Sequence, residues 1–171
     1  MFRRFVFFGM LMAGLASGQG KMGRGQAERF NFRQLMQQIW DGWGTLNPAN
    51  TAKFYSKDVD RTFFDITPLK YHGWNEYDAG VRKVFSDYTS AKFILDADQH
   101  VVQRGNTAWA TATGHGTLMR KTGGKEEMNF RWTVLWEKIE NNWLIVHEHV
   151  SVPLAAPAPV KPASSAPPAK K

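Results

Sequence analysis

The stretch that decides the fold is the closing segment Trp-Leu-Ile-Val-His-Glu-His-Val-Ser-Val-Pro, residues 143–153. It is rich in β-branched and aromatic residues, and a proline ends it, as is typical of a strand. Working outward towards the N-terminus, residues 92–103, 107–119 and 126–139 have the same alternating character. Short links rich in Gly and Asn join these segments, and such residues suit tight hairpin turns. The four segments therefore predict an antiparallel meander.

Helical periodicity precedes the strands. Residues 28–43 carry apolar side chains three and four positions apart, which predicts an amphipathic helix that ends in Trp40 and Trp43. Asn47-Pro48 predicts the start of a short second helix. A short strand at 62–66 follows, and a third helix begins after it. Helices before strands predict an α+β domain, in which three N-terminal helices pack over the concave face of a curved antiparallel sheet.

Composition and charge narrow the classes of protein. The chain has 171 residues, of which 43% are hydrophobic and 22% charged, as expected for one globular domain. It has no cysteine, which excludes disulfides, Fe–S clusters and thiol catalysis. The net charge of +7 lies mostly at the ends, because residues 1–18 carry +2 and residues 155–171 carry +3. A basic patch on the domain itself is therefore not expected, and no nucleic-acid partner is predicted.

The two ends of the chain predict an exported protein. Residues 1–18 combine Arg3 and Arg4 with an apolar stretch and small residues, which is typical of a signal peptide and leaves no stable membrane insertion after cleavage. A buried first helix is the alternative. Residues 19–27 are expected to be a flexible Gly-rich segment, residues 28–154 the domain, and residues 155–171 a disordered Pro/Ala/Lys tail. The expected location is the periplasm or the exterior.

The closing segment also carries a resemblance. Together with Arg-Trp-Thr-Val-Leu-Trp-Glu-Lys at 131–138, it resembles the SnoaL-like branch of the nuclear transport factor 2 and ketosteroid isomerase superfamily. The association domain of calcium/calmodulin-dependent kinase II ends in a similar Trp…Val-His-x-His-x-Ser pattern. The resemblance covers residues 28–154 and implies a cone-shaped fold that encloses one pocket. It also implies a homodimer or larger homo-oligomer that forms through the outer face of the sheet.

Asp65 is the first candidate for chemistry. The resemblance implies a catalytic carboxylate at its place, acting as a general base that moves a proton on the substrate. Its neighbours Phe63 and Phe64 are expected to desolvate it and raise its pKa. An exposed or helix-capping aspartate is the alternative. The first helix has no tyrosine, although the isomerases place one there, so a steroid isomerase is not predicted.

His147 and His149 form the second candidate. They lie two positions apart, so on a strand they share one face, together with Ile145 and Ser151. Three interpretations stay open: neutral residues of the pocket wall, polar contacts to a ligand, or metal ligands with a third partner. We favour the first and predict no metal site. The opposite face of this strand is also largely apolar, so the sequence leaves open which face points inward.

Arg131 completes the charged candidates. If it points inward, its planar guanidinium is a receptor for a ligand carboxylate. If it points outward, we expect it to pair with Glu148 or with an acid of a neighbouring subunit. Trp43 and Tyr55 are expected to form an apolar and hydroxyl-bearing part of the pocket wall.

These observations predict a protein that binds or transforms a small organic molecule, carrying a carbonyl or carboxylate, in an aromatic-lined pocket. If the protein is an enzyme, we expect cofactor-free acid–base chemistry of an isomerase, cyclase or hydrolase type, with Asp65, His147 and His149 as catalytic residues. Arg131, Trp43 and Tyr55 would then contact the ligand. The alternative is a non-catalytic dimeric or ring-forming module.

Overall fold

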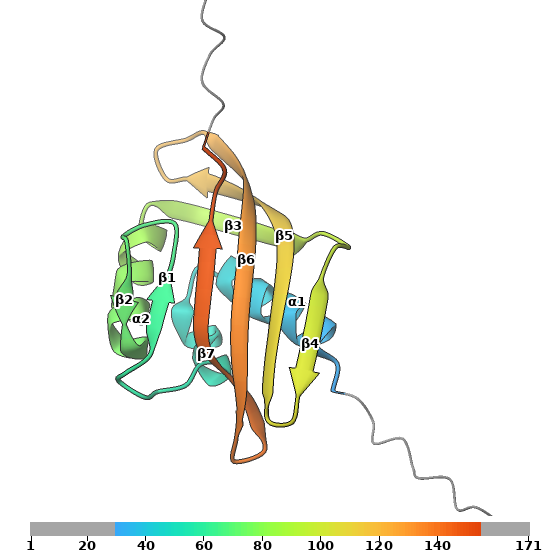
Figure 1. Cartoon of the computed structure of the whole chain (residues 1–171). Helices are drawn as coiled ribbons and strands as arrows, with labels where there is room; N and C mark the ends of the chain where they lie inside the picture. The colour runs from blue at the N-terminus through green and yellow to red at the C-terminus, as the bar shows by residue number, and fades with distance from the viewer. Residues whose placement is uncertain (1–29, 155–171) are drawn as a thin grey trace, which may run out of the picture. The chain divides into compact units, whose positions relative to one another are not determined.

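The computed structural model describes residues 30–154, so the predicted signal peptide, Gly-rich segment and tail lie outside the described residues. Two α-helices are present, α1 (Phe32–Gly44) and α2 (Gly73–Phe85), together with the short 3₁₀ helices η1 (Pro48–Asn50) and η2 (Ala52–Phe54). The strands are β1 (Thr62–Phe64), β2 (Tyr71–His72), β3 (Tyr88–Leu95), β4 (His100–Arg104), β5 (Thr107–Arg120), β6 (Lys125–Ile139) and β7 (Asn142–Ser151). Figure 1 shows their arrangement.

One curled, unclosed sheet contains all seven strands of the described part of the chain. Its order is β2-β1-β7-β6-β5-β3, and β4 pairs with the other end of β5. The antiparallel pairs β3–β5, β5–β6 and β6–β7 confirm the predicted meander. The prediction of a wholly antiparallel sheet is wrong, because β1 runs parallel to β7. A tight hairpin forces antiparallel pairing, but most of the domain lies between β1 and β7 in the chain, so no turn fixes their direction.

The helical part differs from the prediction in one element. Helix α1 begins at the predicted amphipathic segment, where the Asn31 side chain accepts a hydrogen bond from the backbone N–H of Gln34 (3.1 Å). The predicted second helix is instead the pair of 3₁₀ turns η1 and η2, so residues 30–154 form two α-helices and not three. The hydroxyl of Thr51 donates to the carbonyl of Pro48 (2.8 Å), which ends the first turn. Within residues 30–154, neither α-helix has the length and apolar character needed to span a membrane.

The predicted strand at 92–103 is two strands. Both β3 and β4 pair with β5, and the chain leaves the ladder between them at Asp96–Gln99. There the Asp98 carboxylate accepts a hydrogen bond from the backbone N–H of Thr113 (3.0 Å), in place of a carbonyl of a neighbouring strand. A side chain that replaces the backbone as acceptor interrupts the ladder. The interruption lets β3 run at an angle to β4, which gives the sheet its curl (Figure 1).

The core lies between α1 and the concave face of the sheet (Figure 1). On β6, buried Phe130, Trp132 and Val134 alternate with exposed Arg131 and Thr133. The alternation gives the strand one apolar face and one polar face. From α1, the Trp40 ring contacts the rings of Phe130 and Trp132, with centroid distances of 4.3 Å and 5.5 Å. Aromatic packing therefore holds α1 against the sheet, and Trp40 also lines the internal cavity of the domain.

Helix α2 packs against β2 at Gly80. A Cβ atom at this position would lie 2.1 Å from Cε1 of Tyr71, whose ring is buried and contacts Tyr77. We expect Gly80→Ala to lower the free energy of unfolding by about 1–3 kcal/mol, because of overpacking. Helix propensity alone would favour alanine by about 1 kcal/mol. Urea denaturation measures the change, and the loss should disappear when Tyr71 is also replaced by Ala. An equal loss in both backgrounds would contradict this packing argument.

Candidate functional site

A cavity of about 410 Å³ lies between the two α-helices and the inner face of the sheet. Its apolar walls come from both helices and from strands β3, β5, β6 and β7. The aromatic side chains in the lining are Trp40, Trp43, Tyr77, Phe85, Tyr88 and Phe93. The acidic residues in the lining are Asp65, Glu126 and Glu127. A concave, mainly apolar space with few polar groups is typical of a small-molecule site.

Asp65 reaches this cavity because successive side chains of β1 point to opposite faces of the sheet. Phe63 is fully buried and lies opposite Glu148 of β7, whereas Phe64 points to the outer face. Asp65 follows Phe64, so its side chain points to the inner face again and lines the cavity. Its Oδ1 accepts a hydrogen bond from the backbone N–H of Ile66 (2.7 Å). Burial raises the pKa of the Asp65 carboxyl to about 6, and the Ile66 hydrogen bond opposes this shift.

Glu148 lies behind the cavity wall and is 1% exposed. Three neutral donors hold its carboxyl group. Oε1 accepts from the hydroxyls of Tyr77 (2.6 Å) and Tyr55 (2.9 Å), and Oε2 accepts from Nε1 of Trp132 (2.9 Å). Nε1 of Trp43 donates in turn to the Tyr55 oxygen (3.1 Å). This network, which we call the Glu148 network, joins α1, α2, β6, β7 and the residue that follows η2.

The two carboxyls influence each other. Burial raises the pKa of Glu148 to about 7, its three hydrogen bonds oppose the shift, and the negative charge of Asp65 adds to it. Asp65 therefore ionises first, and its charge then disfavours ionisation of Glu148. Burial, together with these carboxylates, holds the pKa values of Tyr55 and Tyr77 well above their usual range. Both tyrosines thus stay neutral hydrogen-bond donors.

Tyr77 connects the network to the cavity. Its ring lines the cavity and stacks on Phe63 with a centroid distance of 5.2 Å, whereas its hydroxyl contacts Glu148, which does not line the cavity. Tyr77 and Glu148 are not among the site residues predicted from the sequence. A signal for Glu148 was present, because a single acid on an apolar strand face must find hydrogen-bond partners inside the protein.

A β-bulge decides which side chains of β7 point inward. Leu135 of β6 pairs with His147 and Trp136 pairs with Ile145, so Val146 has no partner in the ladder. The extra residue reverses the alternation at this point. Ile145 therefore lies on the inner face with Glu148, and the prediction that it shares a face with the two histidines is wrong.

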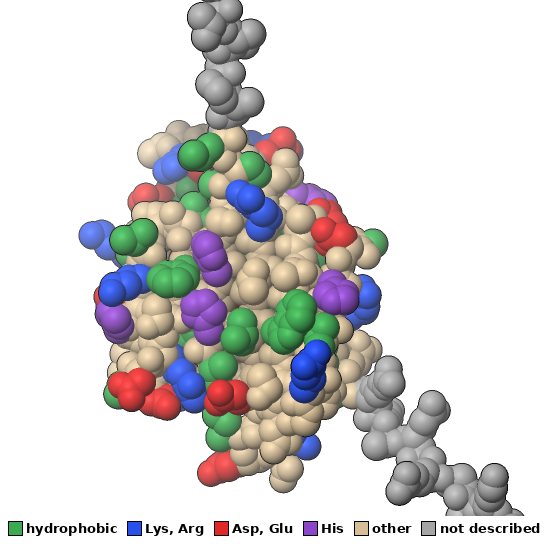
Figure 2. Space-filling model, in the orientation of Figure 1, with side chains coloured by type: hydrophobic (Ala, Val, Ile, Leu, Met, Phe, Trp, Pro, Cys, Tyr) green, Lys and Arg blue, Asp and Glu red, His purple; other side chains and the backbone are tan. Residues whose placement is uncertain are grey.

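The two histidines lie on the outer face of the sheet. Nδ1–H of His147 donates to the carbonyl of Thr62 (2.8 Å), and the Phe64 ring contacts the rings of both histidines. His147 is half-buried and His149 is exposed. Histidine and hydrophobic side chains lie side by side on this face, which Figure 2 shows towards the viewer.

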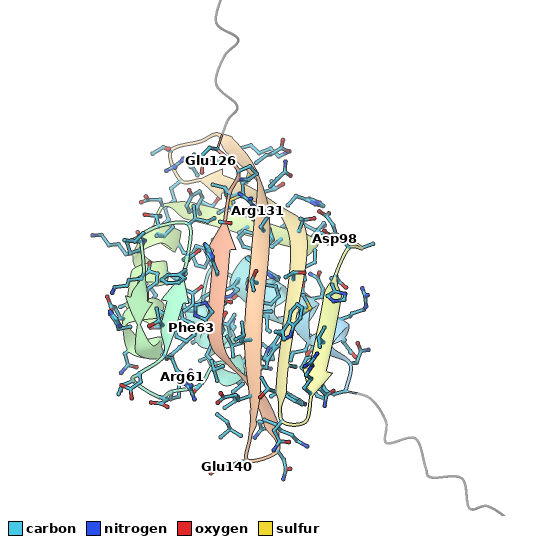
Figure 3. All side chains as sticks on the ribbon, viewed as in Figure 1. Arg61, Phe63, Asp98, Glu126, Arg131 and Glu140 are labelled. Carbon is cyan, nitrogen blue, oxygen red and sulfur yellow. The ribbon has the colours of Figure 1, made fainter. Side chains whose placement is uncertain are left out.

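Arg131 also lies on the outer face, exposed on β6 (Figure 3). It does not pair with Glu148, which points inward. Of the six predicted site residues, Asp65 and Trp43 line the cavity, and Tyr55 lies behind it in the Glu148 network. The two histidines and Arg131 do not line it, so we leave them out of the candidate site. Over residues 30–154, no group of three or more acidic or histidine side chains has the geometry to hold a metal ion.

Comparison with known proteins places this geometry in context. Residues 33–155 match a family model described as a SnoaL-like domain. A search of curated proteins finds no match to the chain.

Solved structures with a similar fold are numerous. One is a nuclear transport factor 2-like superfamily protein from Salmonella enterica, with 19% identity and a TM-score of 0.66, covering 79% of this chain and 94% of that one. Another is a proposed dehydratase of the same superfamily from Streptomyces avermitilis (15% identity, TM-score 0.63, 72% and 94% covered). A third is the association domain of calcium/calmodulin-dependent kinase II from C. elegans (16% identity, TM-score 0.56, 71% and 92% covered). These likenesses concern the fold.

The raised pKa values make stability depend on pH. Asp65 and Glu148 have folded-state pKa values of about 6 and about 7, above their ordinary values of 3.8 and 4.5. The folded state thus keeps protons that the unfolded chain releases, so the free energy of unfolding should fall as the pH rises from about 4 to about 7. Urea denaturation across this range measures the slope.

Asp65→Asn and Glu148→Gln should each flatten that slope. The matched control is Asp98→Asn, because hydrogen bonds from Thr113 lower the pKa of this exposed carboxyl, and its contribution is lost only at more acidic pH. A slope that is unchanged in both Asp65→Asn and Glu148→Gln would contradict the burial of these two carboxyls.

Proposed function

Because this chain belongs to the SnoaL-like domain family, we propose that its cavity binds and transforms a small organic molecule by cofactor-free acid–base chemistry. The observation that carries the proposal is the Asp65 carboxyl, which has a pKa of about 6 and lies in the wall of an aromatic cavity. A carboxylate with a pKa close to neutral accepts and returns a proton efficiently. Asp65 is the proposed base.

We assign two neutral side chains of the cavity lining as donors to a ligand oxygen. Trp40 lines the cavity, and its Nε1–H is buried without a partner among residues 30–154. A buried donor of this kind gains a hydrogen bond when a ligand supplies an acceptor. Tyr77 is the second donor. When Glu148 is protonated, its O–H can donate to the Tyr77 oxygen, which frees the Tyr77 O–H for the ligand.

The proposed reaction begins with proton transfer. Asp65 removes a proton from a carbon next to a carbonyl group, and the electron pair of that C–H bond forms an enolate. Trp40 and Tyr77 stabilise the enolate oxygen by hydrogen bonds. Asp65 then returns the proton to the same carbon or to a neighbouring one. The likeness to a proposed dehydratase supports chemistry of this kind in the fold, and the substrate is left open.

Deuterium exchange tests the base directly. In D₂O, the methyl protons of 2-acetylnaphthalene exchange when a base removes them, and NMR follows the loss of signal. We expect the protein to accelerate this exchange and Asp65→Asn to lower the rate by about 10²–10⁴-fold, while quenching of tryptophan fluorescence shows that the ketone still binds.

The matched controls are Arg131→Ala and His149→Ala, since both side chains lie on the outer face and should leave the exchange rate unchanged. A rate that is the same in Asp65→Asn as in the unaltered protein would contradict the proposed base. Binding without any accelerated exchange would instead support a non-catalytic binding module.

An oligomer is the second part of the proposal. The outer face of the sheet exposes Trp109 (40%) and Ile94 (37%), and such apolar exposure suits an interface between copies. The likeness to a kinase association domain also supports assembly. We propose a homodimer or a larger ring, and export by the N-terminal segment.

Native mass spectrometry of the protein from its host tests assembly and export together. We expect a dimer or larger species, and a mature N-terminus after Gly18 or Gly20. A monomer, or an N-terminus that retains Met1, would contradict the corresponding part of the proposal.

A further inference from the structure

The described lining of the cavity contains acidic side chains and no basic one. Within residues 30–154, no lysine, arginine or histidine lines it, whereas three carboxylates do. Two of these, Glu126 and Glu127, come from the start of β6 at the hairpin with β5, and Figure 3 labels Glu126 there. They form ion pairs with Arg120 and Lys125. Their charges are therefore already balanced, and the unbalanced acid of the cavity is Asp65.

Among the described residues, no cation pairs with the inner acids Asp65 and Glu148. Asp65 forms no ion pair within residues 30–154, and its one hydrogen bond comes from the backbone of Ile66. Glu148, behind Tyr77, is held by three uncharged donors. Carboxylates that are withdrawn from water without a positive partner are costly to ionise. A positive charge that enters the cavity would stabilise the ionised form of Asp65, and a negative charge would oppose it.

The aromatic lining adds to this preference. Six aromatic rings line the cavity, among them those of Trp40, Trp43 and Tyr77. The face of an aromatic ring carries negative electrostatic potential and attracts cations, most strongly where water is excluded. An aromatic wall with one acid suits a cationic head group, and the aliphatic side chains of Leu118 and Val150 suit an apolar body.

We propose that the cavity selects an organic cation, a small apolar molecule with a protonated amine or quaternary ammonium group that lies beside Asp65. The inference rests on the proposed function, because it requires the cavity to be a ligand site. It narrows the ligand class that the sequence suggested. The predicted carboxylate receptor, Arg131, lies on the other face of the sheet, and a carboxylate in the cavity would face Asp65 without a cation to bind it.

Three probes of similar shape and different charge separate the possibilities. Benzyltrimethylammonium carries a positive charge, neopentylbenzene is its uncharged carbon isostere, and phenylacetate carries a negative charge. Tryptophan fluorescence gives each dissociation constant. We expect the cation to bind at least about tenfold more tightly than its isostere, and phenylacetate to bind most weakly.

Asp65→Asn should reduce the affinity for the cation to that of the isostere and leave the isostere unaffected. The matched control is Asp98→Asn, which removes the same charge at the β3–β4 connection and should preserve the preference for the cation. Equal affinities for cation and isostere, the tightest binding by phenylacetate, or a preference that survives Asp65→Asn would each overturn the inference and leave the proposed function standing. If none of the three probes bound, both would be overturned.

Discussion

The structure depends on the burial of one carboxyl group without a cation. A carboxyl withdrawn from water is tolerated only when hydrogen bonds replace the lost solvent. For Glu148, the donors are Tyr55, Tyr77 and Trp132, which come from three separate parts of the chain. The Glu148 network therefore requires α2, β6 and β7 to meet at one place. The same contacts that hold the domain together also orient Tyr77 in the wall of the cavity.

The sheet separates two surfaces with different properties. The inner surface holds a cavity with aromatic walls, a single unpaired acid and no cation among residues 30–154. The outer surface holds His147, His149 and Arg131 beside exposed apolar side chains. Ligand chemistry is proposed for the first surface and contact between copies for the second. Because side chains alternate along each strand, a change on one surface can leave the other intact, which is why Arg131→Ala and His149→Ala on the outer face serve as controls for the exchange reaction.

Periodicity was sufficient to predict most of the fold. The helical spacing of residues 32–43 and the hairpin turns between β5, β6 and β7 are local properties, and local properties are visible in the sequence. The direction of β1 and the division of residues 92–103 were not predicted. The first depends on a distant strand, and the second depends on hydrogen bonds from Thr113 to Asp98, which are 15 positions apart in the chain.

The site was predicted in part for a similar reason. Asp65 was predicted because the family resemblance implies a carboxylate at its place on the short strand at 62–66, and it lines the cavity. The histidines were predicted because they lie two positions apart and share one face of the closing strand. The bulge at Val146 sets which residues of β7 point inward, and a bulge cannot be recognised from the sequence. Glu148, which lies between the two histidines, was not predicted as a site residue. It could have been, because a single acid on an apolar strand face needs hydrogen-bond partners inside the protein.

Two carboxyls that influence each other's pKa are central to the site. Asp65 lines the cavity, and Glu148 lies behind the cavity wall. Carbon-13 NMR of the side-chain carboxyl groups, followed as the pH is changed, measures both pKa values. We expect Asp65 to titrate near 6 and Glu148 near 7, and we expect Asp65→Asn to lower the pKa of Glu148. Titration of both carboxyls near their ordinary values of 3.8 and 4.5, or an unchanged pKa of Glu148 in Asp65→Asn, would contradict the burial of these carboxyls and their interaction.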